Sequence, residues 1–294
     1  MSKGIALSVT ASALFAVMYY YTSLLAPLTG VEIFGWRMLL TMPCMTVFML
    51  VAKEWTLVTR LLRRLVAMPR LLLGAMASSA LMGLQLWLFM WAPLNGYSLD
   101  VSLGYFLLPL SMVLTGRIVY GERLSYFQKI AVFLATLGVL NELYQMGGFS
   151  WATLLVVLGY PLYFILRKRL GTDNLGGLWL DMTLVLPVAL GFVLSGGQGF
   201  AVFDQQPWLS VLIPVLGVIS TSALVTYIIA SRLLSFSLFG LLSYVEPVLL
   251  LGVALLLGES IEAGEWLTYI PIWMAVAVLV LEGFRHLMRQ RRRT

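Results

Sequence analysis

Residues 102–122 read SLGYFLLPLSMVLTGRIVYGE, and residues 240–259 read GLLSYVEPVLLLGVALLLGE. Each stretch has a tyrosine three or four residues before a proline, and then an apolar run that ends in Gly-Glu. Pro109 and Pro247 are 138 positions apart, and the two Gly-Glu pairs are 137 apart. An apolar run of about 20 residues can cross a bilayer as a helix. The two stretches therefore predict two related membrane helices.

A second correspondence links two charged residues to two further prolines. Arg37 precedes Pro43 by six residues, and Asp181 precedes Pro187 by six, so both pairs are offset by 144 positions. Loops of different length explain why this offset differs from the first. The four matches together predict that the chain repeats one arrangement of helices.

The repeat predicts two halves of five helices each, residues 1–145 and residues 146–294, the second with a short basic tail. Because five is odd, the second half must cross the membrane in the opposite direction to the first. Inverted repeats of this kind are typical of secondary transporters, which bind substrate near the midplane between the halves. We expect an all-α integral membrane protein with ten transmembrane helices in two inverted five-helix repeats.

Composition supports this fold class. The chain of 294 residues is 61% hydrophobic and 11% charged, which is unlike a soluble domain. The longest polar stretch, 53–70, is too short for a soluble domain, and the first apolar run continues to Ala26, longer than a signal peptide needs. The predicted helices are 4–26, 31–52, 70–94, 98–119, 125–143, 150–168, 176–196, 208–233, 237–257 and 264–284.

The charges of the short loops predict the orientation, because basic residues accumulate on the cytoplasmic side. Eighteen of the nineteen Lys and Arg residues fall on one side of the predicted helices, and Arg37 lies within a helix. The other side carries only acidic residues: Glu32, Asp100, Glu142, Asp204, Glu259, Glu262 and Glu265. We expect a multi-pass protein of the bacterial cytoplasmic membrane with both termini in the cytoplasm.

Several function classes are disfavoured. The net charge of +6 comes from loops suited to anionic membrane lipids, so we expect no nucleic-acid partner. Cys44 and His286 are the only cysteine and histidine, too few for a zinc site, and we expect no metal and no cofactor. No Walker motif is present. A polytopic membrane enzyme would need a compact catalytic constellation, and the carboxylates are scattered over different predicted helices.

The stretch from Leu81 to Leu140, with LWLFMWAPLNGYSLDVSLGYFLLPL and YGERLSYFQKIAVFLATLGVL, resembles one known family. It is similar to the RarD (chloramphenicol-sensitive protein) branch of the EamA-type drug/metabolite transporters. Further matches are Glu32-Ile33 with Arg37, Tyr163 with Arg167-Lys168, Pro187, and Tyr244 with Pro247. The resemblance implies a ten-helix inner-membrane transporter that exports or exchanges amino acids, metabolites or drugs through a cavity between inverted halves. The family often has asparagine near Gln85 and at Leu108, and an uncharged residue at Glu246.

Three charged residues lie within predicted helices: Arg37, Asp181 and Glu246. A charge at the bilayer centre costs about 2.5–3.5 kcal/mol on insertion scales, so we expect these side chains to face a cavity or a partner. Arg37 and Asp181 lie near opposite ends of the membrane, which disfavours a direct pair and favours gating or ion-pair roles. The alternatives for Arg37 are direct substrate contact, a side chain that extends to the interface, and a pair with Glu32, which a spacing of five helical residues disfavours.

Glu246, near the middle of the predicted helix 237–257, is the strongest candidate for substrate binding. Its neighbour Pro247 removes an intrahelical hydrogen bond and so frees a backbone carbonyl. A carboxylate beside a free carbonyl suits an ammonium group of a substrate or a transported proton. The alternative is a protonated, hydrogen-bonded glutamate with a structural role.

Aromatic and polar residues in the middle of the predicted helices could line the same cavity. Trp87 and Trp91 are four residues apart, on one face of one helix. The alternative for these side chains is helix packing. The full set of predicted cavity residues is Glu246, Tyr244, Tyr105, Trp87, Trp91, Gln85, Tyr160 and Tyr163, and the predicted helix kinks are Pro109, Pro247, Pro43 and Pro187.

The sequence thus predicts a secondary-active or facilitative transporter, and most simply an exporter, that moves a small organic solute by alternating access. Protons are a candidate coupling ion, membrane lipids are the surroundings, and a monomer and a homodimer both fit. A channel-like protein is the alternative, with a membrane enzyme well behind it.

Overall fold

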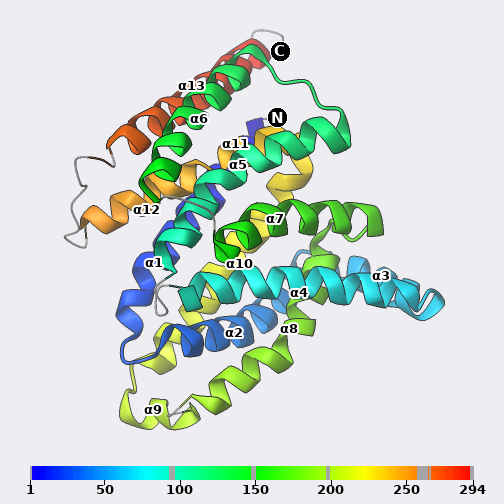
Figure 1. Ribbon diagram of the computed structural model, residues 1–294. Helices are drawn as coiled ribbons and strands as arrows, with labels where there is room; N and C mark the ends of the chain where they lie inside the picture. The colour runs from blue at the N-terminus through cyan, green and yellow to red at the C-terminus, as the bar shows by residue number, and fades with distance from the viewer. Residues whose placement is uncertain are drawn as a thin grey trace. The chain divides into compact units, whose positions relative to one another are not determined.

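The computed structural model describes residues 2–92, 97–146, 150–196, 199–256, 264 and 266–291. Every regular element in these residues is a helix (Figure 1). The long helices are α1 (Ser2–Thr22), α2 (Gly30–Val51), α4 (Arg70–Trp91), α5 (Ser98–Tyr120), α6 (Tyr126–Met146), α7 (Trp151–Leu170), α8 (Leu175–Ser195), α10 (Leu209–Leu233) and α13 (Trp266–Arg291). The shorter ones are η1 (Ser23–Leu25), α3 (Trp55–Ala67), η3 (Gly199–Ala201), α9 (Val202–Gln205), α11 (Phe236–Leu242) and α12 (Val245–Leu256).

Seven helices in the described part of the chain are long and apolar enough to cross a membrane. They cover Lys3–Leu25, Gly30–Val51, Arg70–Phe89, Asp100–Tyr120, Trp151–Leu170, Leu175–Ser195 and Leu209–Leu233. The fold is therefore that of an all-α membrane protein. The count of ten transmembrane helices and the inverted relation between the halves remain predictions.

The charged stretch 53–70, expected as a loop, contains the helix α3 (Trp55–Ala67). Val58 and Leu61 are three residues apart and buried, and Leu61 packs against Leu71 on α4 and Leu180 on α8. The arginines of α3 are too frequent for a membrane span, yet a one-sided apolar stripe is enough to hold a helix against a core. The prediction missed this helix because it sought only long apolar runs.

The predicted continuous helix 237–257 is wrong in one respect. The chain forms α11 (Phe236–Leu242), turns at Ser243 and Tyr244, and resumes as α12 (Val245–Leu256). The apolar composition indicated a span but gave no sign of the break, which lies just before Pro247.

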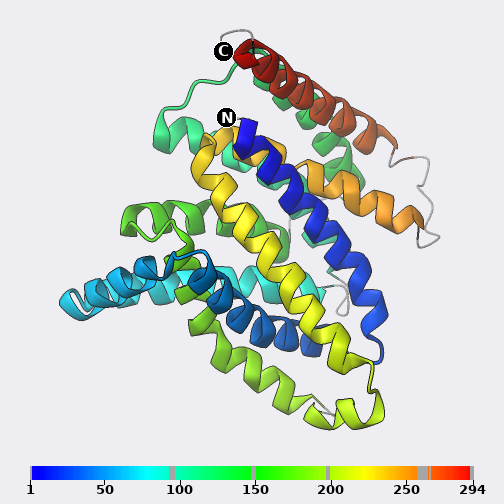
Figure 2. The ribbon, with the colours of Figure 1, turned by 180° about the vertical axis from the view of Figure 1, so that it is seen from behind.

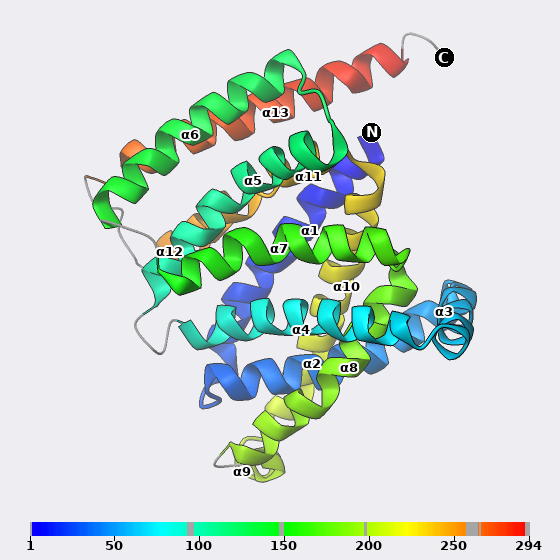
Figure 3. The same cartoon turned by 45° about the vertical axis from the view of Figure 1, so that its right-hand side comes forward.

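The contacts divide the chain into two compact units. Unit 1 comprises Met1–Ala16, Leu99–Pro161 and Ile229–Thr294, and unit 2 comprises Val17–Ser98 and Leu162–Ile228. Within unit 1, α6 lies along α13 (Figures 1 and 2). Within unit 2, α2 and α4 both pack on α8 (Figure 3). Each unit draws on both halves of the sequence, and the halves 1–145 and 146–294 remain a prediction from the repeat.

Gly35 allows α2 and α8 to approach closely. A Cβ atom at this position would lie 2.7 Å from Cγ2 of Val193 and 2.9 Å from the backbone oxygen of Ala189. Beside this contact, the rings of Phe34 and Phe192 meet edge to face with centroids 5.9 Å apart. Such pairs add to the stability that comes from burial alone. Arg37 lies on α2 and Asp181 on α8. The two predicted charged residues of unit 2 therefore lie on neighbouring helices.

Candidate functional site

A buried ion pair links α7 and α8 in unit 2. Nη1 of Arg167 is 3.4 Å from Oδ2 of Asp181, and the two side chains are 1% and 3% exposed. A buried charge is costly without a partner, so each residue explains how the other can be buried. The sequence predicts Asp181 as a gating or ion-pair residue. The structure places it in this pair, and gating remains a prediction.

The carboxylate of Asp181 also accepts hydrogen bonds from two hydroxyl groups. Ser78 on α4 donates to Oδ1 at 2.6 Å, and Tyr163 on α7 donates to Oδ2 at 3.1 Å. Ser79, next to Ser78, donates to the backbone oxygen of Asp181 at 2.9 Å. Both carboxylate oxygens are therefore engaged, and α8 is tied to α4 and α7. Tyr163, a predicted cavity residue, is 4% exposed and belongs to this network.

Arg167 connects the same network to the loop between α7 and α8. Its guanidinium donates to the Tyr163 hydroxyl, to the Thr172 carbonyl (3.0 Å from Nε) and to the Asn174 carbonyl (2.6 Å from Nη2). The sequence analysis counted Arg167 among the basic loop residues suited to anionic lipids, but its side chain is buried, and only its neighbours Lys168 and Arg169 are exposed. The available signal was its spacing: Arg167 follows Tyr163 by four residues, on the same helix face.

Arg37 on α2 is a second buried arginine, with 1% of its surface exposed. Its Nε donates to the Ser220 hydroxyl on α10 at 3.0 Å. Glu32 is instead part of a capping box: its carboxylate accepts from the Thr29 backbone N–H at 2.8 Å. The structure thus gives Arg37 and Asp181 different partners on different helices.

In unit 1, three of the predicted site residues lie in or directly after the break between α11 and α12. Tyr244 is fully buried, and its hydroxyl donates to the Phe106 carbonyl at 2.9 Å. Glu246 is half-buried in the first turn of α12, so it is not in the middle of a helix as predicted. Pro247 lacks the N–H that would bind the Ser243 carbonyl, but the Glu246 N–H reaches that oxygen at 3.2 Å. The carbonyl expected to be free is therefore occupied.

The other three predicted prolines lie within continuous helices: Pro43 in α2, Pro109 in α5 and Pro187 in α8. The break beside Pro247 is therefore not a general effect of proline in this chain. A role of all four residues in helix bending remains a prediction.

The aromatic residues of the predicted cavity occur in both units. In unit 1, the hydroxyls of Tyr105 and Tyr160 are 3.4 Å apart, within hydrogen-bonding distance. In unit 2, Trp87 stacks on Trp91 with centroids 5.0 Å apart, and Trp91 stacks on Tyr97 at 5.4 Å. Gln85, on the same helix as the tryptophans, is 2% exposed. Cavity lining by these residues remains a prediction.

The sequence predicts a structural role for each Gly-Glu turn, in which the glycine ends one helix and the glutamate lies favourably at the start of the next. The first turn fits this prediction in part. Gly121 has φ of +63° just after α5 ends, the left-handed conformation that glycine adopts readily. Glu122, however, does not serve α6. Its two carboxylate oxygens accept the backbone N–H groups of Phe236 (2.7 Å) and Ser237 (2.8 Å) at the start of α11. The second turn, Gly258-Glu259, lies outside the described residues.

Among the described residues, no group of three or more His, Cys, Asp or Glu could hold a metal ion.

Comparison with known proteins places the chain among transporters. No protein-family profile matches it. It is 44% identical over 292 residues to the chloramphenicol-sensitive protein RarD of Pseudomonas aeruginosa, covering 99% of this chain and 98% of the relative. It is 40% identical to an uncharacterized transporter of Haemophilus influenzae, with coverages of 99% and 97%. Protein RarD of Escherichia coli is 28% identical, with coverages of 96% and 95%.

One solved crystal structure superposes on the chain with a TM-score of 0.66 and 15% identity, over 97% of this chain and 99% of the other. That likeness shows a shared fold only. The apolar helices and the bacterial relatives together define a multi-pass transporter of the bacterial inner membrane. The chain belongs to the RarD branch of the drug/metabolite transporter family. The resemblance seen in the sequence is confirmed.

Proposed function

We propose that this transporter is a secondary-active or facilitative exporter of small organic solutes that works by alternating access between two inverted five-helix halves. Both termini lie in the cytoplasm, and the positive-inside charge pattern supports this orientation. The relative from Pseudomonas aeruginosa carries chloramphenicol in its name, so chloramphenicol is a reasonable first ligand alongside amino acids. The proposal assigns the chain no enzymatic step.

The broken helix α11–α12 is the observation on which this proposal depends most. Substrate and ion sites of secondary transporters are typically built at interrupted helices. Here the interruption lies in an apolar segment, and a carboxylate, Glu246, follows it within one helical turn. A negative side chain at this point suits an ammonium-bearing solute or a proton that is exchanged for one. A channel does not need a substrate site of this kind. The site therefore favours a carrier.

Glu246→Gln tests this proposal because it removes the charge and keeps the shape. A thermal-shift screen of the purified protein with amino acids, their analogues and chloramphenicol would first identify a ligand. Counterflow of that ligand in proteoliposomes should then fall on the order of 10-fold or more in the variant, the size expected from losing about 1.5–3 kcal/mol of hydrogen bonding to a charged group.

Glu54→Gln is the matched control. Glu54 is an exposed carboxylate that makes no side-chain hydrogen bond at the start of α3, so its replacement should leave counterflow unchanged. Wild-type counterflow in Glu246→Gln at every pH would contradict a role of Glu246 in binding or proton exchange. Solute flux without saturation or counterflow would instead indicate a channel.

A further inference from the structure

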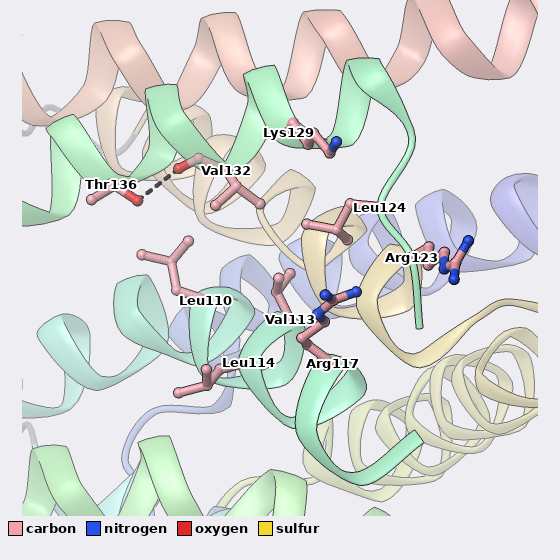
Figure 4. Close-up of a pocket in the computed structure, with 9 residues that line it drawn as sticks. All are labelled: Leu110, Val113, Leu114, Arg117, Arg123, Leu124, Lys129, Val132 and Thr136. Carbon is pink, nitrogen blue, oxygen red and sulfur yellow. Dashed lines mark hydrogen bonds between the residues drawn. The ribbon is translucent and has the colours of Figure 1, made fainter. Parts of the chain in front are cut away.

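A groove with a volume of about 750 Å³ runs between α5 and α6 in unit 1 (Figure 4). This volume falls within the range of about 300–1,000 Å³ that is common for ligand sites. The groove shares no residue with the broken helix or with the Asp181 network. Its occupant must therefore be inferred from its own walls.

The walls of the groove are mostly apolar. Leu110, Val113 and Leu114 on α5 face Val132 on α6. The one hydroxyl group here, on Thr136, donates to the Val132 carbonyl of its own helix at 2.7 Å. Leu114 is 60% exposed, so the groove opens to the outside of the protein. Leu114 lies within a membrane-spanning segment, so the surroundings there are lipid. The walls fit a hydrocarbon chain.

One end of the groove is strongly basic. Arg117 on α5, Arg123 in the connecting loop and Lys129 on α6 lie at this end, and Leu110 and Thr136 lie at the other (Figure 4). All three basic side chains are exposed. The nearby carboxylate of Glu122 is engaged by the N–H groups at the start of α11. Arg117 donates a hydrogen bond to the backbone oxygen of that residue, at 3.3 Å. Among the described residues, none of the three basic side chains forms an ion pair with a carboxylate, so an outside anion can bind them.

The spacing along the helices matches the shape of a lipid. Leu110 and Arg117 are seven residues apart, which corresponds to about 10 Å along a helix. The basic end adjoins the loop between α5 and α6, and a loop of this kind lies outside the hydrocarbon region. The groove thus runs from the depth of phosphate groups to the depth of acyl chains. We infer that it binds an anionic phospholipid, with the phosphate at Arg117, Arg123 and Lys129 and an acyl chain along the leucine and valine walls.

The inference can be tested by native mass spectrometry of the full chain in detergent, titrated with dioleoylphosphatidylglycerol or dioleoylphosphatidylcholine. The anionic lipid should bind more tightly. The triple variant Arg117→Gln, Arg123→Gln, Lys129→Gln should bind it on the order of 100-fold more weakly, given the attraction of each basic residue to anionic lipid. The control Arg60→Gln, Arg63→Gln, Arg70→Gln removes the same charge from exposed positions in α3 and α4 and should retain most of the affinity.

A second pair of variants tests the apolar walls at constant charge. Val132→Trp fills the groove and should abolish tight binding of the anionic lipid. Phe133→Trp changes a neighbouring side chain that is 64% exposed and does not line the groove, so binding should persist. Wild-type affinity in the groove triple variant, equal losses in the two triple variants, or wild-type affinity in Val132→Trp would each overturn the inference. Full displacement of the lipid by inorganic phosphate would also overturn it, because it would indicate a simple anion site.

Discussion

The helices α2 and α8 of unit 2 place a charged residue and a proline at the same spacing, yet they hold the charge in different ways. Arg37 and Asp181 are 1% and 2% exposed. Pro43 and Pro187, each six residues later, are both exposed. Six residues turn an α-helix by about 600°, which puts the proline about 120° away from the charge. In both helices the charge therefore faces the protein and the proline faces outward.

The partners of the two charges differ. Asp181 receives donors from α4 and α7, and its counter-ion Arg167 also binds two loop carbonyls. Arg37 binds the Ser220 hydroxyl on α10. The two positions that the predicted repeat makes equivalent thus have different partners. The comparison indicates that α8 is anchored by an ionic network and that α2 is held to α10 through at least one charged–neutral hydrogen bond.

The largest effect is expected from Arg167→Met, which removes the counter-ion and leaves Asp181 buried. Breaking a buried ion pair by removing one partner costs about 3–5 kcal/mol. The free energy of unfolding should fall by about this amount in denaturant titrations in mixed micelles. Arg169→Met removes an exposed arginine from the same helix end and should change it by less than about 0.5 kcal/mol. Equal stability of the two variants would mean that the ionic network does not anchor α8.

Asp181 and Arg167 also show how far the sequence could predict the candidate site. Asp181 stood out because a carboxylate in an apolar helix needs a partner. Arg167 did not, because it lies among basic residues at a helix end, where most arginines are exposed. Its neighbours Lys168 and Arg169 are indeed exposed. The spacing of four residues puts Arg167 on the same helix face as Tyr163. Only the packing of α4 and of the α7–α8 loop decides that this face turns inward, and the sequence did not predict that packing.

The fold shows the same division. Long apolar runs predicted helical segments well, because about 20 apolar residues in lipid must satisfy their backbone groups within a helix. The helix α3 was missed because it is held by the packing of Leu61 on α4 and α8, which a search for long apolar runs does not detect. The break at Ser243 was missed as well. Proline alone did not predict it, since α2, α5 and α8 continue through theirs.

A smaller effect is expected on the α2 side. Ser220→Ala removes the hydroxyl that accepts from Arg37, and a hydrogen bond to a charged group is worth about 1.5–3 kcal/mol. Ser222→Ala is the control, because that hydroxyl donates only to the Val218 carbonyl of its own helix at 2.8 Å. Thermal unfolding in detergent should therefore show a clear loss for Ser220→Ala and almost none for Ser222→Ala. A Ser220→Ala loss as large as that of Arg167→Met would erase the distinction between the two helices.

The smallest effects should be equal on the two sides. The hydroxyl of Ser79 donates to the Asp181 carbonyl at 2.9 Å, and the hydroxyl of Thr221 donates to the Thr41 carbonyl at 3.1 Å. Both bonds are buried and neutral, so Ser79→Ala and Thr221→Val should each cost about 0.5–1.5 kcal/mol. The two bonds share no partner, and the double variant should lose the sum to within about 0.3–0.5 kcal/mol. If Ser79→Ala lowers the free energy of unfolding much more than Thr221→Val does, the hydrogen bond to the Asp181 carbonyl must be coupled to the ionic network. If the two agree, the difference between α2 and α8 resides in the charged side chains alone.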